Sequence, residues 1–152
     1  MCNVAELKAA RKEIERLKSE LAPLVPPAHR GTISGDYLRQ LLTEKFDFAS
    51  VYISDKTKYL CDIEDVNIFL EQDKTNRERY VANDYDCDDF TYRLMGQFSV
   101  PGWAKFAKGI LWTNTHALLC FVDTNCDVWT IEPQTDGYSK IENPISARII
   151  MM

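Results

Sequence analysis

The chain has 152 residues, of which 45% are hydrophobic and 27% are charged, and its formal net charge is −5. This size and composition are those of one globular domain that can bury a core without metals or disulfides. The acidic balance excludes nucleic acid as a favoured partner. No apolar run approaches the roughly 20 residues that cross a bilayer, so no membrane contact is expected.

The first 24 residues are predicted to form an amphipathic helix. Asn3 and Glu6 have the spacing of a capping box, and apolar residues recur at heptad spacing from Leu7 to Leu24. This stripe suits either a short coiled coil, which would make a homo-oligomer, or docking of the helix on its own domain. The segment lacks the apolar core of a signal peptide, so we expect a cytoplasmic protein.

The rest of the chain divides by composition into a linker, residues 25–35, and a folded domain, residues 36–152. Apolar spacing within the domain predicts helices over 36–46, 63–75 and 87–96, and strands over 50–54, 58–62, 116–122, 127–133 and 146–152. This order predicts an α+β fold, in which the cysteine-bearing helix packs on an antiparallel sheet and an N-terminal helix precedes both.

The cysteines are expected to be free thiols, because none of the five forms a CxxC pair and the chain has only two histidines. One of them stands in the stretch NDYDCDDFTYRLMGQ, where Cys87 is surrounded by Asp84, Asp86, Asp88 and Asp89. Asp86 has the position of an N-cap, and Asp89 the position that completes a capping box. Cys87 then takes the first helical position, where the dipole favours a thiolate although the aspartates oppose it.

Two further residues are candidates for a catalytic group with Cys87. His116 begins one predicted strand and Glu132 ends the next, and a turn near residues 124–125 places the two opposite each other at the open end of the hairpin. An imidazolium beside a cysteine favours the thiolate, and a carboxylate can fix the imidazole tautomer. We therefore expect Cys87 to be a nucleophile, His116 its base and Glu132 the orienting acid, in the chain order of papain-like sites.

Three segments taken together, YDCDDFTYRLMG, HALLCFVD and VWTIEPQTD, resemble a known family. This is the family of the papain-like C-terminal domain of the Marasmius oreades agglutinin, with its phage and bacterial relatives. The resemblance spans roughly residues 60–140 and implies a papain-like fold with the same roles for the three catalytic candidates. It also implies a thiol peptidase activated by calcium or manganese. Because hard cations take oxygen ligands, Asp84, Asp86, Asp88 and Asp89 are the candidate metal ligands.

The expected function is a thiol hydrolase, a peptidase or amidase that acts on a peptide or protein substrate by acyl transfer. Papain-like enzymes have a glutamine six residues before the nucleophile, but this chain has Val81 there. Asn83 or the Cys87 backbone N–H is expected to serve the oxyanion hole instead. One alternative is a catalytically inactive papain-like binding or regulatory protein of phage or bacterial origin, acting in the host cytosol if a phage encodes it. Another is an assembly role through the N-terminal helix.

Overall fold

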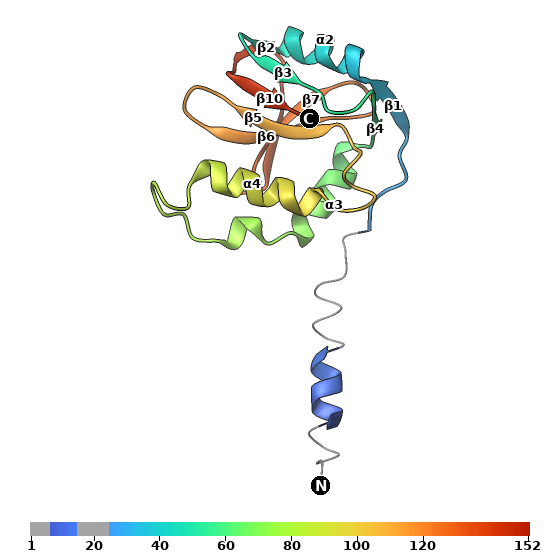
Figure 1. Cartoon of the computed structure of the whole chain (residues 1–152), viewed down its shortest axis with the longest axis vertical. Coiled ribbons are helices and arrows are strands. Elements are labelled where there is room, and N and C mark those ends of the chain that lie inside the picture. Colours follow the sequence, from blue (N-terminus) through green and yellow to red (C-terminus); the bar gives the residue numbers. More distant parts are fainter. Residues whose placement is uncertain (1–6, 15–24) are drawn as a thin grey trace.

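The computed structural model describes residues 7–14 and 25–152 (Figure 1). Residues 7–14 form a helix whose side chains are all exposed. The rest of the helix predicted for residues 1–24 lies outside the described residues, so the coiled coil and the homo-oligomer stay predictions.

The folded domain alternates short helices and strands along the chain. In order they are β1 (Gly31–Ser34), α2 (Gly35–Lys45), β2 (Phe46–Asp47), β3 (Ser50–Tyr52), β4 (Thr57–Leu60), α3 (Ile63–Gln72), the 3-10 helix η1 (Thr75–Arg77), α4 (Cys87–Phe98), β5 (Lys108–Trp112), β6 (Ala117–Val122), β7 (Val128–Glu132), β8 (Gly137–Lys140), β9 (Ile145–Ser146) and β10 (Ile149–Met151). The main sheet has six strands in the order β3-β10-β5-β6-β7-β8.

The main sheet is mixed, so the prediction of an antiparallel sheet is wrong at one edge. Neighbouring strands are antiparallel except β10, which runs parallel to β3 with Ile149 opposite Ser50. Hairpins leave a local turn signal in the sequence, whereas a parallel pair of distant strands leaves none. This explains why the pattern of residues did not reveal the pairing.

The segment predicted as a linker, residues 25–35, contains the first strand. β1 pairs antiparallel with β4, with Gly31 opposite Leu60. Ser34 then caps α2, because its side-chain oxygen accepts a hydrogen bond from the Tyr37 N–H at 3.2 Å. The Pro and Gly content of the segment concealed this short strand.

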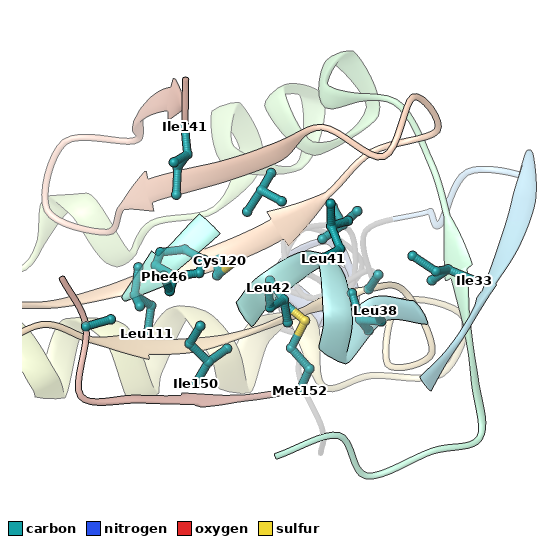
Figure 2. Close-up of a cluster of buried hydrophobic side chains, with 14 of the residues drawn as sticks. Ile33, Leu38, Leu41, Leu42, Phe46, Leu111, Cys120, Ile141, Ile150 and Met152 are labelled. Atoms are coloured by element: carbon teal, nitrogen blue, oxygen red, sulfur yellow. The ribbon is translucent and has the colours of Figure 1, made fainter. Parts of the chain in front are cut away.

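Helices cover both faces of the main sheet, with α2 on one side and α3 and α4 on the other (Figure 1). One apolar core lies against α2, as Figure 2 shows, and a second involves α3 and α4. β6 contributes to both cores, because alternate side chains of a strand point to opposite faces. Cys120 and Val122 belong to the first core, and Leu119 and Phe121 to the second. Because both faces of β6 are buried, its sequence is a continuous run of apolar residues.

Lys108, at the start of β5, is a charged residue inside this fold. It is 4% exposed, and its Nζ donates a hydrogen bond to the Ala104 carbonyl at 3.3 Å. Burial lowers the pKa of Lys108 to about 8 from its ordinary 10.5. Below pH 8 the Lys108 ammonium is charged in the folded protein and in the unfolded chain, so folding must move a charge from water into the interior. The free-energy cost of burying this charge decreases as the pH rises from about 8 to 10.5.

Lys108→Met is accordingly expected to raise the free energy of unfolding by about 1–3 kcal/mol at pH 7. The gain should shrink as the pH rises from about 8 and level off above 10.5, where the lysine is mostly neutral in both states. Urea unfolding at several pH values measures both quantities, with the exposed Lys56→Met as the matched control. A lower stability of Lys108→Met at pH 7 would mean that the bond to Ala104 outweighs the buried charge.

Candidate functional site

An open groove of about 560 Å³ lies where the N-terminus of α4 meets the turn before β6. Its floor is a row of residues that lie in register across four neighbouring strands, namely Ser50, Ile149, Trp112 and Ala117. Tyr92 of α4 packs edge-on against Trp112, with ring centroids 5.9 Å apart. The groove is thus the part of this sheet face that α4 leaves open.

Cys87 lines this groove as the first residue of α4. The predicted capping box is confirmed, because the Asp86 N–H donates to Asp89 at 3.1 Å and the Asp86 side chain accepts from the Asp89 N–H. The Cys87 carbonyl accepts a hydrogen bond from the Thr91 hydroxyl at 2.8 Å. The local sequence therefore fixes the start of the helix and holds the half-buried thiol at the groove.

His116 lines the same groove from the turn that connects β5 to β6. Thr113 holds this turn, because its hydroxyl oxygen accepts from the His116 N–H at 3.0 Å and its own N–H donates to the His116 carbonyl at 2.9 Å. The imidazole Nε2 lies 2.5 Å from Glu132 Oε2. A carboxylate at Nε2 favours the tautomer with the proton on Nε2, which leaves the Nδ1 lone pair available.

The predicted contact between His116 and Glu132 is present, but not through the predicted register. Leu119 pairs with Ile131, so the hairpin places residue 134 opposite His116. Glu132 is therefore the diagonal neighbour of His116, within reach of two long side chains. Glu132 Oε1 also accepts the Gln134 N–H at 3.2 Å, which fixes the carboxylate. The catalytic roles of the three residues stay predictions.

Asn83, predicted for the oxyanion hole, lies outside the groove lining in the loop before α4. It is exposed, its φ is 61°, and its backbone N–H donates to Asp86 Oδ2 at 3.1 Å. The groove instead includes two residues for which no role was predicted, Tyr52 and Arg148. The β3–β10 pairing brings Tyr52 and Arg148 there, and no local signal in the sequence marks that pairing.

The predicted metal ligands divide into two groups. Asp86 and Asp88 lie with Cys87 so that their candidate donor atoms are within 4.8 Å of one another, whereas Asp84 and Asp89 are not in this group. A hydrogen bond between the two carboxyl groups raises the pKa of Asp88 and lowers that of Asp86. Asp86 also accepts backbone N–H bonds, so this set of two carboxylates and a soft sulfur fits calcium poorly. Calcium or manganese here stays a prediction.

No helix within residues 7–14 and 25–152 is both long enough and apolar enough to cross a lipid bilayer.

Comparison with known proteins gives matches at the level of structure. No protein-family model and no curated protein sequence matches the chain. One solved structure that does match is a complex of PSL1a, a Polyporus squamosus lectin, with the compound E64. It has a TM-score of 0.67 and 17% sequence identity, over 80% of this chain and 51% of that chain.

A second match is the Polyporus squamosus lectin bound to the human-type influenza-binding epitope Neu5Aca2-6Galb1-4GlcNAc. Its TM-score is 0.62 and its identity 18%, over 80% of this chain and 49% of that chain. The chain thus spans about half the length of each structure, and the likeness shows a shared fold.

The matched structures are described as a lectin, and their descriptions do not name a papain-like peptidase. These matches contradict the predicted papain-like family and fold, and the predicted peptide or protein partner. They also contradict the predicted thiol peptidase or amidase function and its alternative, an inactive papain-like binding or regulatory protein of phage or bacterial origin. The resemblance depended on short segments that encode local structure. These are a capping box at Asp86–Asp89 and a strand end at Glu132, and such structures recur in unrelated folds.

Proposed function

We propose that Cys87 is a nucleophilic thiol that bonds covalently to an electrophilic ligand held in the groove. His116 is its base, and Glu132 orients the imidazole. The observation that carries the proposal is the 2.5 Å contact between His116 Nε2 and Glu132 Oε2, made by a histidine that lines the same groove as the thiol. A histidine oriented in this way beside a thiol is the usual means of activating a cysteine.

The chemistry follows from the tautomer that Glu132 favours. The Cys87 S–H proton passes to His116 Nδ1, and the sulfur then attacks an electrophilic carbon of the ligand. When the ligand is an epoxide, the bond from that carbon to the ring oxygen breaks, and this oxygen takes the proton back from the imidazolium. Glu132 stabilises the imidazolium during the step, and the N-terminus of α4 stabilises the thiolate.

The groove residues indicate the kind of ligand that the site would take. Arg148, exposed at the wall, offers a guanidinium for a carboxylate or another anionic group. Trp112 and Tyr52 offer aromatic surface beside it. An electrophile that carries a negative charge and an apolar part fits these groups best. A thiolate must stay reduced to react, so the cytosol is the compartment we propose.

The compound E64, an epoxide, tests this function directly. Incubation followed by peptide mass mapping is expected to find the adduct on Cys87, with Cys126 in the β6–β7 turn unmodified. Cys87→Ser should abolish the adduct. Iodoacetamide, which needs no binding groove, should label Cys87 at least tenfold faster than Cys126 at pH 6. Equal labelling of the two cysteines, together with no E64 adduct, would refute the proposed nucleophile.

A glycan is the second candidate ligand for the groove. It is favoured by the aromatic rings of Trp112 and Tyr52 and by the matched lectin complex with a sialylated trisaccharide. Calorimetric titration of the same protein sample with that trisaccharide separates the two candidates. Heat of binding that is lost in Trp112→Ala, without any labelling of Cys87 by E64, would favour the glycan.

A further inference from the structure

A second polar cluster lies away from the groove, between the segment after α3 and the turn that joins β7 to β8. Among the described residues, the buried side-chain atoms without a hydrogen-bond partner include Thr75 Oγ1, Asn76 Oδ1 and Asp136 Oδ1. Buried polar atoms are almost always hydrogen-bonded, and each unpaired one costs about 1–3 kcal/mol. Three of them in one place call for a ligand that supplies the missing interactions.

Two hydrogen bonds join the residues of the cluster in pairs. The Asn76 side-chain amide donates to Asp136 Oδ2, and the Thr75 N–H donates to Asp73 Oδ2 at 2.7 Å. Thr75 is 1% exposed and Asp73 is 7% exposed, so two of the members are buried deeply. The first contact also spans sixty positions of sequence and therefore joins two separate segments.

The electrostatics of the cluster favour a cation. Burial, and then the nearby carboxylate of Asp73, raise the pKa of Asp136 to about 6, although Arg77 and the hydrogen bond from Asn76 act in the opposite direction. Two carboxylates are thus held close together in a partly buried place, where their repulsion is weakly screened. A bound divalent cation would remove this repulsion and would also satisfy the neutral oxygens.

We propose that Asp73, Thr75, Asn76 and Asp136 form a binding site for a divalent cation of the calcium type. The donors are two carboxylates, one hydroxyl and one amide oxygen, which are the hard oxygen ligands that calcium prefers. Water completes the coordination. This site differs from the aspartates around Cys87 in its burial and in its unsatisfied oxygens. It is also independent of the proposed thiol chemistry.

The cation would tie two loops together. Asp136 is held at a φ of 58° in the turn that follows Glu132, and residues 73–76 follow α3. A cation bound to both segments would fix that turn against the helical layer without any new protein contact. Its expected signature is a higher melting temperature in calcium, since a ligand that binds only the folded state stabilises it.

Calorimetric titration with calcium chloride and thermal unfolding with and without calcium test the site on the full chain. The wild type is expected to bind calcium at about 1 mM or tighter and to melt several degrees higher in its presence. Asp136→Asn should weaken binding at least tenfold. Without calcium, this variant should be as stable as the wild type or more stable, because it removes one of two repelling carboxylates.

Thr75→Val is a second variant, which deletes the unpartnered hydroxyl and keeps the shape of the side chain. It should weaken binding, and in the absence of calcium it should be more stable than the wild type, because it removes an unpaired buried hydroxyl. Asp47→Asn is the matched control, since Asp47 is an exposed aspartate outside the cluster and outside the predicted ligands around Cys87. Its affinity should equal that of the wild type. No binding by the wild type, unchanged binding by Asp136→Asn, or an equal loss in Asp47→Asn would each overturn the proposal.

Discussion

His116→Ala is expected to slow the alkylation of Cys87 by iodoacetamide roughly tenfold at pH 7. The reason is that the thiolate is the reacting form of a cysteine, and an imidazole base that accepts the thiol proton promotes its formation. The variant keeps the thiol at the start of α4 and removes this base. Pseudo-first-order labelling rates, followed by mass spectrometry at pH 7, measure the difference.

Two further variants test whether the slower alkylation of Cys87 is caused by the loss of His116 itself. His29→Ala is the matched control, because His29 stacks on Tyr59 at a ring distance of 4.1 Å and does not line the groove. Glu132→Gln keeps the shape of the orienting side chain and removes its charge, so its rate should fall between those of the wild type and His116→Ala. Equal rates for the wild type and His116→Ala would show that His116 is not the base.

Gly109→Ala is expected to lower the free energy of unfolding by more than about 4 kcal/mol, or to prevent folding. A Cβ at this position of β5 would lie 1.9 Å from the Met151 carbonyl oxygen and 2.6 Å from Met152 Cγ. The first of these atoms belongs to the backbone of β10 and cannot move without breaking the sheet. Separation of β5 from β10 would also disrupt the groove floor, because Trp112 of β5 is paired with Ile149 of β10.

Gly96→Ala provides the matched control for this effect. Gly96 lies in α4, and a Cβ there would meet nothing within 4 Å. Alanine has the higher helix propensity, so this variant should be more stable by about 0.5–1 kcal/mol. Chemical denaturation of both variants tests the pair. A loss of less than about 1 kcal/mol in Gly109→Ala would mean that β10 can shift at little cost.

The parts of the site that could be predicted are those encoded locally. The capping box of Asp86 and Asp89 is four residues long, and it placed Cys87 at the start of α4. The contact between His116 and Glu132 depends on one hairpin, so an error of two positions in the register still left the two side chains within reach.

The parts that could not be predicted depend on distant pairings. Arg148 and Tyr52 reach the groove through the parallel pairing of β3 with β10, for which the chain carries no turn signal. Asn83 was predicted to replace the glutamine that papain-like enzymes have where this chain has Val81, but its positive φ belongs to a tight loop that lies outside the groove lining. The family resemblance failed for a related reason, because short segments specify local structure and leave the wider topology open.

The parallel pairing also has a consequence for the order of folding. Ile149 lies opposite Ser50, about a hundred residues away in sequence, and closing so long a loop is slow. The β6–β7 hairpin and α4 need only nearby residues, so they can form well before that closure. The histidine and its carboxylate would then meet early in folding, while the floor beneath the thiol is completed among the last steps. Reactivity toward a small reagent and recognition of a larger ligand should thus be acquired at different times as the chain folds.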